Sequence, residues 1–234
     1  MLIQETHLRA ADKCYFPNYT FYSTSSRTGY RMRGTGIIIK SNIPHYPISN
    51  PYLYYVEATM LMVNYNDLPP INFISVYNPP NNSCQFTMDF ESLIAYNTIT
   101  FIAGDLNAKH RHWNCARANN LGNQLNNFAI HAKMRIIAPD HPTCYTRFGE
   151  SVIDLAITRN FNYPTTAESL VELGSDHLPV RFHVETGTNP SLYDKQKFTP
   201  NWKKYQEYLL LAPPPLQHEK GNRIGSRINN CSFN

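Results

Sequence analysis

Short apolar runs, each bounded by polar or Pro- and Gly-containing segments, recur along the chain and predict β-strands. Residues 71–77 alternate between apolar and polar positions, as expected of a strand with one buried face, and Asn78-Pro79-Pro80 ends the run. Residues 36–39 and 100–103 are apolar apart from Thr100, which is typical of strands buried on both faces. The predicted strands are 36–39, 55–63, 71–77, 100–103, 152–158 and 180–184.

Two stretches between these strands carry the spacing of amphipathic helices. Residues 89–96 place Phe90, Leu93 and Ile94 on one face, with Thr87 as a candidate N-cap, and residues 121–132 repeat the pattern. Strands that alternate with occasional helices predict an α/β or α+β sandwich over residues 1–186.

The pattern loosens after residue 186. Residues 187–211 are predicted to be a linker whose second half, 201–211, forms an amphipathic helix that Pro213-Pro214-Pro215 ends. Residues 212–234 are polar and rich in Gly and Asn, so we expect a disordered tail.

Composition narrows the class of protein only slightly. The net charge of +4 is compatible with a polyanionic partner without requiring one. The five cysteines are odd in number and contain no Cys-x-x-Cys pair, which argues against a disulfide framework or a paired zinc site and favours an intracellular protein. Neither a signal peptide nor an apolar run of about 18 residues is present, so no membrane span is expected.

Five positions carry candidate chemistry. Asp105 and Asn107 follow an apolar strand and, being two residues apart, can point the same way from its end. Asp154 lies in an otherwise apolar strand, where an unpaired carboxylate would cost several kcal/mol, so we expect it to pair with His177. Glu5 follows an apolar segment and could hold a hard cation. Taken singly, each position is better explained as an ordinary turn or strand-end residue, except Asp154, for which a solvent-facing position on an edge strand is an equal alternative.

The order of these segments resembles the endonuclease/exonuclease/phosphatase superfamily, which includes the apurinic endonucleases, deoxyribonuclease I and the inositol polyphosphate phosphatases. The segments are Gln4-Glu5-Thr6, Tyr77-Asn78-Pro79, Gly104-Asp105-Leu106-Asn107, Asp154, and Ser175-Asp176-His177 with Pro179. Within that superfamily, the nuclease domain of jockey-type non-LTR retrotransposons is the closest likeness. Three stretches carry this likeness. The first is Gly104 to His110 followed by Trp113-Asn114, the second is Pro142-Thr143 followed by the strand 153–158, and the third runs from Glu168-Ser169 to residues 175–180.

The resemblance implies a four-layer α/β sandwich of two mixed β-sheets flanked by helices, with the site at one edge. It implies Mg²⁺-dependent nicking of DNA in the nucleus, with Mn²⁺ as a possible substitute, and a reverse transcriptase domain in the intact parent element. Glu5 would hold the metal with support from Asp176, and Asp105 and Asn107 would orient or activate the attacking water. His177, held by Asp154, would stabilise the developing charge, and Tyr77 would contact the phosphate.

A second group of residues is predicted to touch DNA, because cationic and aromatic side chains suit phosphate contacts and base stacking. Solvated surface loops are an equal alternative for them. The group consists of His110, His112, Trp113, Arg31 and Arg33.

One departure from the family pattern concerns the start of the chain. The family begins with an Asn-bearing strand and a crossover helix, a unit of about 30 residues, whereas Met1 falls almost at the Gln-Glu-Thr strand. We therefore expect the first strand and helix to be missing and the activity of this chain to be in doubt. A catalytically dead DNA-binding remnant, or a phosphoesterase of the same superfamily acting on small substrates, remain open alternatives.

Overall fold

The computed structural model describes residues 1–187, apart from residues 10, 13, 26–32, 66–67, 83–84, 96–97, 148 and 172–174. The predicted helix at 201–211 and the predicted disorder of 212–234 lie outside the described residues. Within the described part, no helix has the length and apolarity needed to cross a membrane.

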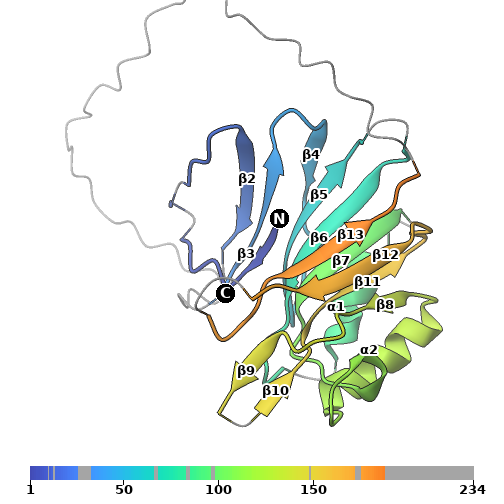
Figure 1. The fold of residues 1–234 in the computed structure, drawn as a ribbon. Helices are drawn as coiled ribbons and strands as arrows, with labels where there is room; N and C mark the ends of the chain where they lie inside the picture. Colours follow the sequence, from blue (N-terminus) through green and yellow to red (C-terminus); the bar gives the residue numbers. More distant parts are fainter. Residues whose placement is uncertain are drawn as a thin grey trace, which may run out of the picture. The chain divides into compact units, whose positions relative to one another are not determined.

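A six-stranded mixed sheet forms the centre of the fold, in the order β4-β5-β6-β7-β11-β8 (Figure 1). Strands β6 and β7 are parallel and every other neighbouring pair is antiparallel. A parallel pair needs a crossover connection, which helix α1 supplies between β6 and β7. The strands are β4 (His45–Ile48), β5 (Glu57–Val63), β6 (Ile71–Tyr77), β7 (Ile99–Asp105), β8 (Arg135–Ile137) and β11 (Asp154–Arg159).

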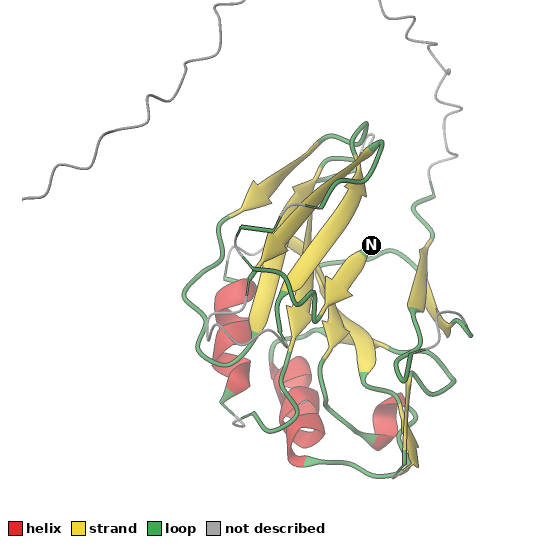
Figure 2. Ribbon diagram, turned by 90° about the vertical axis from the view of Figure 1, so that its left-hand side faces the viewer, coloured by secondary structure: helices red, strands yellow, loops and turns green. Residues whose placement is uncertain are grey.

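Helices α1 (Phe86–Leu93) and α2 (Asn120–His131) cover one face of this sheet, and Figure 2 shows them on the same side of it. Both helices were predicted, but α1 begins three residues earlier, so Thr87 lies inside it and does not cap it. The side chain of Asn119 caps α2 by accepting a hydrogen bond from Gly122 N at 2.7 Å.

Two small antiparallel sheets cover the opposite face of the six-stranded sheet (Figure 2). One has the order β1-β3-β2 and the other pairs β12 with β13, while a separate hairpin, β9-β10, lies between β8 and β11 in the chain. The bounds are β1 (Leu2–Gln4), β2 (Tyr19–Thr24), β3 (Thr35–Lys40), β9 (Cys144–Thr146), β10 (Gly149–Ser151), β12 (Thr165–Ser169) and β13 (Val180–Val184).

The expected four layers are therefore only partly present. The described residues form three layers, with one mixed sheet and two smaller antiparallel ones, because both α-helices lie on the same face of the central sheet. The predicted fold class is thus confirmed in part: the described residues contain a mixed sheet, smaller antiparallel sheets and α-helices on one face of the central sheet.

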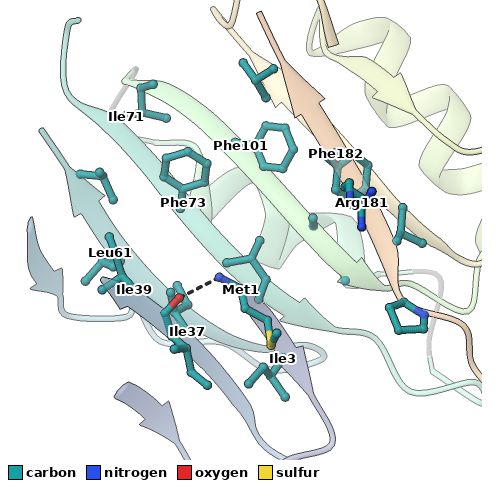
Figure 3. Close-up of a pocket in the computed structure, with 18 of the residues that line it drawn as sticks. Met1, Ile3, Ile37, Ile39, Leu61, Ile71, Phe73, Phe101, Arg181 and Phe182 are labelled. Carbon is teal, nitrogen blue, oxygen red and sulfur yellow. Dashed lines mark hydrogen bonds between the residues drawn. The ribbon is translucent and has the colours of Figure 1, made fainter. Parts of the chain in front are cut away.

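An apolar groove of about 940 Å³ separates the two small sheets. Its floor is the central sheet, with Phe73 and Phe101, and its walls are β1 with β3 on one side and Phe182 of β13 on the other (Figure 3). Among the described residues, β1 pairs only with β3 and β13 only with β12. One end of the groove reaches Asp154 and His177.

Candidate active site

Three acidic or phenolic side chains stand in one row at one end of the central sheet. Tyr77 ends β6, Asp105 ends β7 and Asp154 begins β11, and Asp105 is the register partner of both other residues. Residues paired across neighbouring strands point to the same face. The fold therefore gathers residues that are separated by up to 77 positions in the sequence.

The predicted partnership of Asp154 with His177 is confirmed. Nδ1 of His177 lies 3.0 Å from Oδ2 and 3.3 Å from Oδ1 of Asp154. This hydrogen bond to the carboxylate raises the pKa of His177 to about 9, against the opposing effect of burial. The imidazole is therefore protonated at neutral pH, next to the carboxylates of Asp154 and Asp105.

Asp105 and Asn107 form a closed unit at the end of β7. One carboxylate oxygen of Asp105 accepts a hydrogen bond from Asn107 N at 3.0 Å and the other accepts one from Asn107 Nδ2 at 2.9 Å. Asn107 adopts a positive φ of 48°, which asparagine tolerates better than most residues. Burial, followed by the negative charge of Asp154, raises the pKa of Asp105 well above its usual range.

Glu5 and Tyr77 stand beside this unit. Burial, followed by interaction with the Glu5 carboxylate, raises the pKa of Tyr77 above its usual range. Tyr77 is therefore a neutral hydroxyl donor. The charge of Glu5 also contributes to the raised pKa of Asp105, which places the two carboxylates within electrostatic reach of each other.

The donor types suit a hard divalent cation, although no group of three or more His, Cys, Asp or Glu side chains that could hold a metal ion occurs among the described residues. Magnesium is held by one or two carboxylates together with water and phosphate oxygens, and Glu5 and Asp105 supply carboxylates whose mutual repulsion a cation would relieve. Asp176, also predicted for the metal, is exposed, and its charge contributes to the raised pKa of His177. It therefore lies on the histidine side of the site.

The residues predicted to contact DNA are distributed unevenly. Arg33 lies close enough to Tyr77 for its positive charge to act on that phenol, whereas Arg31 lies outside the described residues. His110 and His112 contact each other, with ring centroids 4.5 Å apart, and the ring of His112 remains exposed.

Trp113 does not fit the predicted role. Its side chain is only 2% exposed and its indole nitrogen donates to Ala108 O at 3.0 Å, so the ring belongs to the core beneath the loop. Stacking of a base on this ring is excluded in this conformation, because no face of the indole reaches the surface. The sequence around Trp113 does not indicate whether its side chain is buried or exposed, and in the structure the ring packs in the apolar core.

Two positioning residues had no role assigned from the sequence. Asn78 is fully buried: its side chain donates to Leu106 O at 2.9 Å, its backbone N–H donates to Asp105 O at 2.9 Å, and its carbonyl accepts from Asn107 Nδ2 at 3.1 Å. Asn78 and Thr143 both lie in the motifs that carry the family resemblance, and only this position in the sequence pointed to a role for them.

Thr143 clamps both members of the Asp154–His177 pair. Its hydroxyl accepts hydrogen bonds from Ile153 N at 3.0 Å and Asp154 N at 3.1 Å. Its carbonyl accepts a hydrogen bond from Leu178 N, next to His177, at 2.7 Å. One buried residue thus fixes the backbone on either side of the pair.

Comparison with known proteins agrees with this arrangement. The sequence profile of the family described as endonuclease-reverse transcriptase matches residues 71–181. The chain is 31% identical, over 77% of its length, to the RNA-directed DNA polymerase from the mobile element jockey of Drosophila melanogaster, and 28% identical, over 80% of its length, to that of the transposon X-element of the same species. The chain belongs to the endonuclease/exonuclease/phosphatase superfamily.

Solved structures of this superfamily share the fold. The endonuclease domain of TRAS1, a telomere-specific non-LTR retrotransposon, aligns with a TM-score of 0.60 at 14% identity, covering 74% of this chain and 83% of that domain. The catalytic domain of Xenopus laevis APE2 aligns with a TM-score of 0.55 at 16% identity, covering 78% of this chain and 82% of that domain. The chain spans only about a fifth of the retrotransposon polymerases, covering 21% and 20% of their lengths.

Proposed function

We propose that this chain is a magnesium-dependent endonuclease that hydrolyses a phosphodiester bond in DNA. The observation that carries the proposal is the position of His177, held 3.0 Å from Asp154 beside the Asp105–Asn107 unit at one end of the sheet. A cation fixed next to carboxylates suits a reaction in which negative charge builds up on a phosphate. The superfamily membership supports the same chemistry.

The side chains take distinct roles in this proposal. Protonated His177 donates a hydrogen bond to the phosphate as charge develops, and Asp154 holds the ring and keeps it charged. Asp105, whose carboxylate is fixed by Asn107, accepts the proton of the attacking water. The neutral hydroxyl of Tyr77 donates to a phosphate oxygen.

Glu5 would hold the magnesium ion with support from Asp176, and manganese would substitute for it. The ion supplies charge neutralisation and Lewis-acid polarisation of the phosphate. In a polypeptide that also carries a reverse transcriptase, the 3′-hydroxyl left by nicking of nuclear target DNA would serve as the primer.

Nicking of supercoiled plasmid in the presence of Mg²⁺ tests the proposal. We expect open-circle product from the unaltered chain, none in EDTA, and a rate at least about a hundredfold lower for His177→Ala. His183→Ala is the matched control, because His183 is exposed on β13, in the separate β12–β13 sheet, and takes no part in the site.

Thermal melting of each variant must accompany the assay. If the unaltered, folded chain binds plasmid without nicking it, the proposal is wrong and the DNA-binding remnant is favoured. Hydrolysis of a small phosphoester without plasmid nicking would instead support the small-substrate phosphoesterase.

A further inference from the structure

Two neighbouring tyrosines form an exposed aromatic surface near the candidate active site. Tyr52 and Tyr54 are 78% and 69% exposed, yet their rings contact each other with centroids 4.8 Å apart. Single exposed aromatic residues are common, but two rings held together in water leave ring faces available to a partner. Nothing in the proposed reaction uses them.

The loop that carries these tyrosines is held firmly. The buried carboxylate of Asp89 accepts hydrogen bonds from the backbone N–H groups of Tyr54, Tyr55 and Val56, at 3.0, 2.6 and 2.8 Å. The Tyr55 hydroxyl donates to Gln85 Oε1 at 2.6 Å. Since backbone groups make most of these bonds, the exposed rings of Tyr52 and Tyr54 can be changed without removing the anchors.

Hydrogen bonds also connect this loop to the catalytic unit. Asn82 Nδ2 donates to Tyr55 O at 2.8 Å and to Asn78 Oδ1 at 2.6 Å. The carbonyl of Asn78 in turn accepts a hydrogen bond from Asn107 at 3.1 Å. The tyrosines are therefore fixed relative to Asp105, which a base-stacking surface near a scissile phosphate requires.

The sheet register places the tyrosines at the same end of the sheet as the site. Glu57, at the start of β5, is the partner of Tyr77, which is the partner of Asp105. Asp105 thus lies two strand spacings from Glu57, about 10 Å, and Tyr54 precedes Glu57 by three residues, a reach of at most about 10 Å. The span is therefore at most about 20 Å, which at a rise of about 3.4 Å per stacked nucleotide corresponds to no more than about six nucleotides.

We propose that Tyr52 and Tyr54 form a stacking surface for unpaired DNA bases that lie a few nucleotides from the bond to be cut. Aromatic rings stack on bases of any sequence, so the surface would add affinity without specifying a sequence. The inference rests on the proposed function, because DNA must lie across this end of the sheet. It adds a contact with single-stranded DNA at a distance from the catalytic residues.

The test is a binding titration in EDTA, so that no cleavage is needed. The probes are a DNA duplex of fixed length with single-stranded thymidine tails of zero, about three, six or nine nucleotides on either strand. For the unaltered chain, affinity should increase with the tail and level off near six nucleotides. The Tyr52→Ala/Tyr54→Ala double variant should lose this increase, roughly tenfold in affinity, and bind the blunt duplex as before.

Two further variants sharpen the result. Tyr52→Phe/Tyr54→Phe should retain the increase, because stacking needs the ring and not the hydroxyl. Tyr46→Ala is the matched control: Tyr46 is 52% exposed but pairs with Met62, near the far end of β5. It should behave as the unaltered chain.

The outcomes separate this inference from the proposed function. Plasmid nicking that persists while tails add nothing to affinity, or add as much for the alanine double variant, overturns the stacking surface and leaves the endonuclease standing. Tail-dependent binding without any nicking supports the surface and overturns the endonuclease. Concentration-dependent self-association that disappears in the double variant, without a tail effect, would assign the tyrosines to a protein contact instead.

Discussion

Asp89→Asn should destabilise the fold more than most single substitutions, because this side chain is a buried hub for backbone groups. It is 1% exposed, and its two oxygens accept bonds from Tyr54 N (3.0 Å to each), Tyr55 N (2.6 Å) and Val56 N (2.8 Å). Asparagine keeps one acceptor oxygen, loses the charge, and turns an NH₂ group towards N–H donors.

The magnitude follows from these contacts. A hydrogen bond to a charged group contributes about 1.5 to 3 kcal/mol, and a buried donor left unpaired costs a similar amount. One oxygen of Asp89, Oδ2, accepts from all three N–H groups, so the asparagine oxygen can keep these bonds at that position. Loss of the charge at about 1 kcal/mol for each bond, with the NH₂ group turned towards Tyr54 N, should lower the free energy of unfolding by about 3 kcal/mol. For a domain of this size, the melting temperature should fall by about 6 to 12 °C.

Urea titration followed by circular dichroism measures this change, with Glu91→Gln as the control. Glu91 lies on the same helix but is exposed, so its variant should stay within about 0.5 kcal/mol of the unaltered chain. An Asp89→Asn variant as stable as Glu91→Gln would refute the argument that the carboxylate holds the tyrosine loop.

Three other outcomes follow from the site and its support. Gly122→Ala should cost about 1 to 3 kcal/mol in thermal or urea unfolding, because a Cβ there would lie 1.8 Å from Lys109 O; a variant as stable as the parent would contradict this close approach. Thr143→Val should cost about 2 kcal/mol in urea unfolding and slow nicking, since it leaves two buried N–H groups unpaired; unchanged stability and rate would count against the clamp. The pKa of His177 is raised from 6.5 to about 9, so folding favours its protonated form. The resulting stabilisation is complete below pH 6.5 and is lost as the pH rises through about 9. The nicking rate should therefore decline near pH 9, and at a lower pH for Asp154→Asn, while a flat pH–rate profile would argue against a protonated histidine.

Many of the longer strands were predictable from sequence, because they carry strong local patterns. The strands at 71–77 and 180–184 were predicted at their observed bounds, and 36–39 and 100–103 fall within β3 and β7. A buried strand must be apolar on one or both faces, so the pattern identifies it without reference to its neighbours.

The short strands were not predictable on the same basis. Strand β2 is largely polar, and β8, β9 and β10 have three residues each, too few for a period to be recognised. What fixes them is pairing with distant segments, as when β8 aligns Ile137 with Ala156 of β11. The start of α1 was misplaced for a related reason, since its N-cap Gln85 makes no side-chain capping bond.

The features of the candidate site also differ in how far the sequence could predict them. The pairing of Asp154 with His177 could be predicted because a carboxylate in an apolar strand requires a partner. The buried position of Trp113 and the linking role of Asn78 could not be predicted. Both depend on hydrogen bonds to backbone carbonyls, of Ala108 and Leu106, whose positions only the folded structure defines. The catalytic role of the site residues remains a prediction.

The clamp formed by Thr143 has a consequence for how this fold tolerates change. The groove between the small sheets is a loosely filled region, and strand β13 forms one of its walls just beyond His177. Since Thr143 binds the backbone on both sides of the pair, small movements of that wall are insulated from the contact between Asp154 and His177. Packing in the groove and chemistry at its end can therefore vary separately: substitutions such as Phe182→Leu should alter stability while leaving the titration of His177 in place.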